Sequence, residues 1–176
     1  MSTIDLMLLG VLMQKPMNAY EIKKIMEYRN IKEWVKISSP STYKNLLKLC
    51  KSGYLDGEVV REGEMPEKTI YTINDKGREY FMQLMLKYSE TPDNTYIDFT
   101  AFIANLHCVD KDIGLKMIES LQINLATKYD ILQREHKKHD GVVPFYVTEI
   151  ISLYLQVASV FCNWAEEFKK KYDEHD

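Results

Sequence analysis

Apolar residues recur at helical spacing through most of the chain, which predicts a largely α-helical protein. Residues 4–13 are apolar on nearly all sides, so we expect a deeply packed first helix. A second helix is expected from Asn18, because Glu21 three residues later completes a capping-box pattern. A third is expected between Ser39, a good N-cap residue, and Gly53. Two such helices in succession are typical of a helix-turn-helix.

A two-stranded β wing is predicted after the third helix. Residues 54–61 and 69–73 are rich in β-branched and aromatic residues, and the loop between them contains glycine and proline. Asn74 or Asp75 then caps a fourth helix. Large residues line one side of this helix at Tyr80, Phe81, Leu84, Met85 and Tyr88.

The second half of the chain is predicted to be helical throughout. After a break at residues 91–94, the pattern predicts helices at 96–106, 110–139 and 145–172. The last is apolar almost all round between residues 150 and 165, so it needs a covering partner. We predict a homodimer interface at Ile150, Ile151, Tyr154, Val157, Phe161, Trp164 and Phe168.

The predicted fold class is therefore mainly α, in two domains. Residues 1–90 form a winged helix-turn-helix DNA-binding domain with a two-stranded β wing, and residues 91–176 form an all-helical dimerisation domain.

Charge is distributed unevenly along the chain. The net charge of −3 over 176 residues does not by itself indicate a nucleic-acid binder. Residues 1–90 contain 14 Lys and Arg against 12 Asp and Glu, a net of +2, whereas residues 91–176 contain 9 against 14, a net of −5. No acidic residue occurs from Val35 to Leu55. The third helix is therefore the best candidate for contact with DNA phosphates.

That helix has an apolar side and a polar side. We predict that Tyr43, Leu46, Leu47 and Cys50 form a packing stripe. The polar side consists of Ser41, Thr42, Lys44, Asn45, Lys48 and Lys51. Hydroxyl and amide groups near the helix start suit base edges in a major groove, and lysines suit phosphates. The same pattern also suits the solvated face of an ordinary helix.

Candidate catalytic and metal-binding groups are few. His136 and His139 share a helix face, but no third ligand of matching type stands nearby. His107 and Cys108 are adjacent and should point in different directions, which favours a structural role. We expect neither an enzyme nor a bound metal or cofactor.

The cysteines favour a cytoplasmic location. Cys50, Cys108 and Cys162 are odd in number and far apart, which suits reduced thiols. Polar residues interrupt each apolar run, so we expect no membrane span, and the first residues do not resemble a secretion leader.

Four motifs resemble the PadR family of transcriptional regulators. Residues 8–12 (LLGVL) and 15–22 (KPMNAYEI) look like the family's first two helices. Residues 39–43 (SPSTY) are similar to the start of its recognition helix. Residues 51–55 (KSGYL) and 71–79 (YTINDKGRE) resemble the beginning of its wing and of its fourth helix. The acidic helical half looks like the longer subgroup with a virulence-activator-type C-terminal domain.

The resemblance implies a homodimeric DNA-binding regulator, usually a repressor and often released by a small molecule. A dimer would place two recognition helices in successive major grooves and bind a pseudopalindromic double-stranded operator. By the family pattern, Lys68 lies in the wing. The candidate DNA-binding residues are Lys36, Ser39, Ser41, Thr42, Tyr43, Lys44, Asn45, Lys48 and Lys68.

The sequence departs from the family pattern in two places. The wing loop carries Glu62, Glu64 and Glu67, which would repel phosphate, and Ala19 stands where the family often has glycine. The alternative function is therefore a winged-helix module for protein–protein assembly that has no specific DNA target.

Aromatic residues near the domain boundary suggest a pocket for a small aromatic effector, although aromatic residues at helical spacing also suit an ordinary core. The candidates are Trp34, Tyr88, Tyr96, Phe99 and Phe102.

Overall fold

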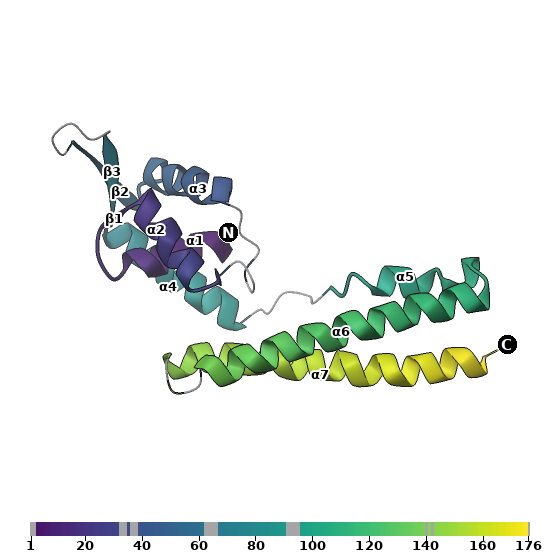
Figure 1. Ribbon diagram of the computed structural model, residues 1–176. Coiled ribbons are helices and arrows are strands. Elements are labelled where there is room, and N and C mark those ends of the chain that lie inside the picture. The colour runs from purple at the N-terminus through teal and green to yellow at the C-terminus, as the bar shows by residue number, and fades with distance from the viewer. Residues whose placement is uncertain are drawn as a thin grey trace. The chain divides into compact units, whose positions relative to one another are not determined.

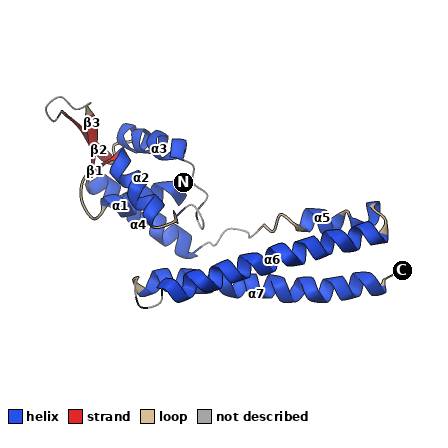
Figure 2. Cartoon of the chain, viewed as in Figure 1, coloured by secondary structure: helices blue, strands red, loops and turns tan. Residues whose placement is uncertain are grey.

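The computed structural model describes residues 3–31, 35, 39–61, 67–90, 96–139, 141 and 143–175 (Figure 1). The chain divides into two compact units, a first unit of residues 1–95 and a second unit of residues 96–176. Helices predominate, and the strands among the described residues all belong to the first unit (Figure 2). The predicted fold class, mainly α with a winged helix-turn-helix, is confirmed.

The first unit is a winged helix-turn-helix. Its helices are α1 (Thr3–Leu12), α2 (Ala19–Tyr28), α3 (Ser39–Lys51) and α4 (Asp75–Glu90). Its strands are β1 (Met17–Asn18), β2 (Leu55–Val60) and β3 (Lys68–Ile73). Strands β2 and β3 pair antiparallel as the wing, with Leu55 opposite Ile73 and Val60 opposite Lys68.

The short strand β1 was not predicted. It adds to the free edge of β3, with Met17 opposite Tyr71 and Asn18 opposite Ile70, so the sheet order is β1-β3-β2. A strand of two residues leaves no alternation for a sequence pattern to show. The capping box of α2 is confirmed, since Asn18 Oδ1 accepts from the Glu21 N–H and Glu21 Oε2 accepts from the Asn18 N–H, each at 2.9 Å.

The core of the first unit surrounds α1. Leu8 and Leu9 of α1 are fully buried, together with Ile22 of α2, Leu46 of α3 and Leu84 of α4. Each large apolar side chain buried in this way contributes about 1.5–3 kcal/mol relative to exposure in water. One continuous cluster therefore fixes α3 against the other three helices and the sheet.

The second unit is a long helical hairpin preceded by short helical segments. The short segments are α5 (Thr100–Ala104) and η2 (Leu106–Cys108), and the hairpin consists of α6 (Lys111–His139) and α7 (Phe145–Glu174). Helices α6 and α7 lie side by side along their length (Figure 1). The two long helices agree with the prediction. The single helix predicted over 96–106 is wrong, because the Asn105 side chain donates to the Ala101 carbonyl at 2.8 Å and the α-helix ends there.

Helix α7 exposes most of its apolar surface. Only Ala158 and Ala165 are buried among its 30 residues. An 18-residue window within it has a mean hydropathy of 1.5, and 6% of that window is buried inside the chain. By length and composition alone, α7 is long and apolar enough to cross a membrane, although polar residues such as Ser152 and Gln156 interrupt it, as expected from the sequence. An apolar helix that its own chain leaves uncovered needs another surface to cover it.

Candidate nucleic-acid interface

The buried side of α3 differs from the predicted packing stripe. Thr42, Leu46 and Leu49 are buried at 3%, 0% and 1% exposure, whereas Tyr43 and Leu47 are exposed at 45% and 54%. The predicted stripe is therefore confirmed at Leu46 and at the half-buried Cys50, and it is wrong at Tyr43 and Leu47. Apolar residues on α3 occupy two faces, and contacts with α1, α2 and β2 select the one that is buried.

As a result of this packing, the exposed side of α3 contains both lysines and apolar residues. The lysine face of α3 consists of exposed residues: Tyr43, Lys44, Leu47, Lys48 and Lys51. Thr42 was expected to reach base edges, but its burial removes it from this face. Asn45 is half-buried and interacts with other groups of the chain. Lys36 and the side chains of Ser39 and Ser41 lie outside the described residues.

One lysine of this face is held by a buried acid. Lys48 Nζ lies 3.5 Å from Asp5 Oδ2 of α1, and the Asp5 side chain is 1% exposed. The Tyr80 hydroxyl of α4 donates to the same oxygen at 3.5 Å. Burial, followed by the Asp5 carboxylate, raises the pKa of Tyr80, so its hydroxyl keeps the proton that it donates. Sequence reasoning missed Asp5, although an acid within an apolar helix was a visible signal.

The end of α3 is closed by a glycine C-cap. Gly53 has φ +75°, its N–H donates to the Cys50 carbonyl at 2.9 Å, and the Tyr54 N–H donates to the Leu49 carbonyl at 3.0 Å. These two bonds form a Schellman motif and bear out the predicted helix end. Burial raises the pKa of the Cys50 thiol, so it remains protonated at neutral pH and acts as a packing group.

The base of the wing is fastened to α4. Asn74 Nδ2 donates to the Gly53 carbonyl at 3.2 Å and to Asp56 Oδ1 at 3.1 Å, while Asn74 Oδ1 accepts from the Gly77 N–H at 3.1 Å. The Tyr54 and Tyr80 rings stack with centroids 4.3 Å apart. The wing therefore begins at a fixed point relative to the end of α3.

The wing carries few described cations. Arg61 is exposed, Lys68 is half-buried and has an interaction within the chain, and Glu67 is exposed beside it. The predicted loop acids Glu62 and Glu64 lie outside the described residues.

The second unit presents a heptad stripe on α7. Exposed or half-buried apolar residues alternate at steps of four and three: Tyr146, Ile150, Leu153, Val157, Val160 and Trp164, named here the α7 seam. Leu153 and Val160, at 58% and 63% exposure, were missed by the predicted interface set. Of that set, Tyr154 is also exposed, whereas Ile151, Phe161 and Phe168 are half-buried.

Aromatic rings on the same helix pack within the second unit. Phe99 lies 5.5 Å from Phe161 and 5.6 Å from Trp164 between ring centroids, and Trp164 stacks on Phe168 at 5.1 Å. Of the other effector candidates, Tyr96 is 83% exposed and Phe102 is half-buried.

The remaining two effector candidates belong to the first unit. Tyr88 is hydrogen-bonded to Thr3 through their hydroxyl oxygens, which lie 3.1 Å apart. Trp34 lies outside the described residues.

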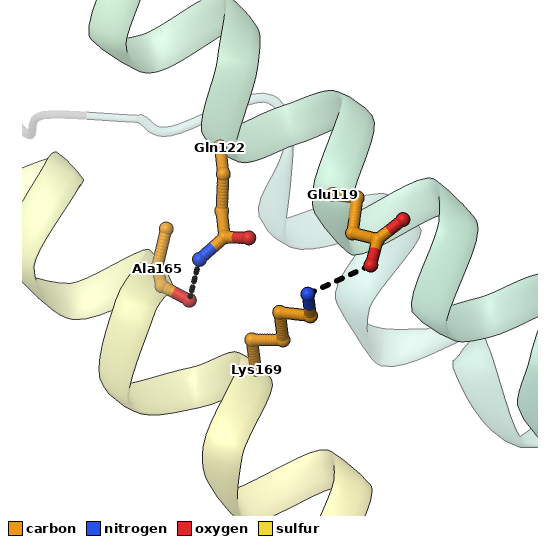
Figure 3. Close-up of polar contacts among 4 residues, drawn as sticks. All are labelled: Glu119, Gln122, Ala165 and Lys169. Carbon is orange, nitrogen blue, oxygen red and sulfur yellow. Dashed lines mark hydrogen bonds and ion pairs between the residues drawn. The ribbon is translucent and has the colours of Figure 1, made fainter.

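Polar contacts between α6 and α7 include those drawn in Figure 3. Lys169 Nζ donates to Glu119 Oε1 at 2.7 Å, and Gln122 Nε2 donates to the Ala165 carbonyl at 3.3 Å. The hydrogen bond and charge of Lys169 lower the pKa of Glu119. These contacts fix the relative position of the two helices without covering the α7 seam.

The adjacent His107 and Cys108 do meet, contrary to the sequence interpretation. Cys108 Sγ lies 3.3 Å from His107 Nε2, and His107 Nδ1 lies 3.1 Å from the Ala104 carbonyl oxygen. Both residues belong to η2 rather than to an α-helix, so the argument from α-helical directions does not apply. Within the described part of the chain, no group of three His, Cys, Asp or Glu side chains could hold a metal ion.

The fold is that of the winged helix-turn-helix class of DNA-binding proteins. The sequence model of the family described as "Transcriptional regulator PadR-like family" matches residues 8–83. The resemblance inferred from the motifs is thereby confirmed, and the chain carries a PadR-like transcriptional regulator domain over these residues. Sequence comparison with curated proteins finds no match.

Solved structures share the fold of the whole chain. Bacillus subtilis PadR in complex with operator DNA has a TM-score of 0.79 at 17% identity, covering 98% of each chain. The same protein in complex with p-coumaric acid has a TM-score of 0.81 at 15% identity, covering 97% of this chain and 98% of that one. The Vibrio cholerae virulence activator AphA has a TM-score of 0.71 at 16% identity, covering 98% and 99%.

Proposed function

We propose that the protein is a cytoplasmic homodimeric repressor that binds a pseudopalindromic operator through α3 and is released by a small aromatic effector. The observation that carries this proposal is the lysine face of α3, which is exposed and free of acidic residues within a PadR-like domain. A structural relative, Bacillus subtilis PadR, is known in complex with operator DNA, which supports the same use of the fold here.

Each group on α3 suits a different part of DNA. Lys44 is exposed near the start of the helix and suits a phosphate. Asn45 suits an adenine edge, because an amide can pair with it through two hydrogen bonds. Tyr43 and Leu47 are exposed and offer apolar contact to a thymine methyl group. The helix therefore combines phosphate neutralisation with base recognition.

The α7 seam supports homodimerisation. A 3-4 repeat of apolar residues is the pattern that packs one helix against another. A second copy of the chain offers the same stripe, as a two-fold symmetric interface requires. Two recognition helices set about 34 Å apart would then reach successive major grooves.

DNA binding is tested first by footprinting the purified protein on the DNA upstream of its own gene. Lys44→Ala should weaken binding to all sequences alike and lower the slope of log affinity against log salt by about one unit. Asn45→Ala should cost about 1–3 kcal/mol on the operator and little on random DNA. Lys128 is an exposed lysine of α6, and Lys128→Ala serves as the control that should change neither the operator affinity nor the salt slope.

A null result for both α3 variants would contradict recognition by this helix. In that case, the alternative function, a winged-helix assembly module without a specific DNA target, gains support.

Effector release is tested by adding planar aromatic acids to the protein–operator complex. The expected result is loss of operator binding together with a change in tryptophan fluorescence, because Trp34 and Trp164 lie within or beside the predicted effector set. Bacillus subtilis PadR binds p-coumaric acid, which makes this class of compound the first choice. Operator binding that no such compound weakens would remove the effector from the proposal.

A further inference from the structure

We propose that Asp5 is a positioning residue for DNA recognition: it holds the recognition helix through Lys48 and ties it to α4 through Tyr80. This inference rests on the proposed function, since it assigns roles within the same DNA-binding helix. It also separates Lys48 from Lys44, which the sequence treats as equivalent phosphate contacts on one exposed side.

The geometry places Asp5 where three helices meet. Its side chain leaves α1 and is 1% exposed, and its Oδ2 lies 3.5 Å both from Lys48 Nζ of α3 and from the Tyr80 hydroxyl of α4. Asp5 Oδ1 is buried and has no hydrogen-bond partner among the described residues. A buried carboxylate that water does not reach depends on such partners for its stability.

Lys48 is the cation that offsets this buried charge. Its side chain is 60% exposed, and its ammonium nitrogen lies 3.5 Å from Asp5 Oδ2. If Lys48 turned to a DNA phosphate, the Asp5 carboxylate would lose its positive partner inside a core lined by Leu8 and Leu9. The ion pair therefore favours a Lys48 that stays on Asp5 while the protein is bound to DNA.

Tyr80 extends the same contact to α4. Its ring stacks on Tyr54, the residue immediately before β2 of the wing, with centroids 4.3 Å apart. Asp5 thus receives a cation from the recognition helix and a hydroxyl from the helix that supports the wing. Losing Asp5 would loosen α3 relative to the wing and reduce discrimination between operator and random DNA.

The decisive measurement is the affinity of the full-length protein for operator and for random DNA over a series of salt concentrations. Asp5→Asn should lower the ratio of operator to random affinity about tenfold, the size of one lost base contact. It should also steepen the salt dependence on random DNA by about one unit, because the released Lys48 becomes available to phosphate.

Variants of Lys48 complete the test. Lys48→Met should lower the operator-to-random ratio without changing the salt slope, whereas Lys44→Ala should lower the slope by about one unit. Lys48→Arg keeps the charge on Asp5 and should preserve both the ratio and the slope. The double variant Asp5→Asn/Lys48→Met leaves no unpaired charge. Its fold-loss in the operator-to-random affinity ratio should be less than the product of the fold-losses of the two single variants.

The outcomes separate this inference from the proposed function. If Lys48→Met lowers the slope as Lys44→Ala does, or if the Asp5 and Lys48 losses multiply, Lys48 is a phosphate contact and the inference is overturned. If Lys44→Ala and Asn45→Ala have no effect on operator binding, the proposed function itself fails. If Asp5→Asn does not fold, as circular dichroism would show, the salt slopes of Lys48→Met and Lys48→Arg still decide whether Lys48 contacts phosphate.

Discussion

The two units of the chain bury their apolar residues to very different extents. The first unit closes a core of its own, in which side chains from four helices and the sheet are excluded from water. The second unit consists largely of two long helices, and α7 buries only Ala158 and Ala165 within its own chain. Because exposed apolar area on this scale is unfavourable in water, we expect the first unit to fold on its own contacts and the second to need a partner.

Polar contacts follow the same division. In the first unit, Asn74 and Asp5 connect separate elements from part-buried or buried positions. In the second unit, the Lys169–Glu119 contact between α6 and α7 lies at the surface. We therefore expect substitutions that disturb the packing of the first unit to lower its stability, and those on the α7 seam to weaken association.

The largest effect is expected on the α7 seam. Val160→Glu would place a charge in the centre of the proposed dimer interface and should weaken association by about a hundredfold or more. Asn163→Glu introduces the same charge at an exposed flanking position of the same helix, where coiled coils tolerate glutamate, and serves as the control. Sedimentation equilibrium measures both. A Val160→Glu protein as dimeric as the control would remove the seam from the interface.

The next largest effect is expected where α4 meets the wing. A Cβ at Gly77 would collide with the Tyr54 carbonyl oxygen and lie 2.8 Å from Ile73 Cγ1. Gly77→Ala should therefore destabilise the first unit by about 3 kcal/mol, the upper end for overpacking. At Gly10 a Cβ meets only Phe81 Cε2 at 3.5 Å, so Gly10→Ala should stay within about 1 kcal/mol of wild type.

Urea unfolding followed by circular dichroism measures both glycine variants. Equal stability of the two would show that α4 can shift away from the wing at little cost, and the first unit would then be less rigid than its packing indicates.

A smaller effect is expected at the cap of α4. Asn74→Ala removes the acceptor for the Gly77 N–H and both donated bonds to the wing base, so it should cost about 1–2 kcal/mol. Asn124→Ala on α6 removes only a bond to the Ser120 carbonyl of its own helix, and thermal unfolding should barely change. Equal losses in the two variants would contradict a special role for the wing base.

The smallest effect concerns the exposed ion pair of the second unit. Lys169→Met should raise the pKa of Glu119 towards its ordinary value, whereas Lys170→Met at the neighbouring exposed position should not. Because the folded pKa is lowered, the pair stabilises the fold above the ordinary Glu pKa, and this contribution is lost as the pH falls through the folded pKa. NMR titration of the carboxyl carbon measures the change. An unaltered Glu119 titration in Lys169→Met would mean that the pair does not persist in solution.

Local signals in the sequence determined most of the secondary structure. The capping box of Asn18 and Glu21, the glycine end at Gly53 and the repeats along 110–139 and 145–172 depend on residues within a few positions of one another. Such short-range patterns persist whatever the rest of the chain does. The motifs that resemble the PadR family lie in the same elements, which explains why the winged-helix fold class could be predicted from the sequence.

Only the tertiary structure determined which sides of these helices are buried and which are exposed. It buries Thr42 and exposes Tyr43 and Leu47, although the pattern of α3 permits either orientation. It brings Asp5 against Lys48, and it leaves the α7 seam open along one side of the hairpin. Each of these outcomes depends on contacts between segments distant in sequence. Helical periodicity shows that a helix has faces, but the packing of the remaining elements selects the face that is buried.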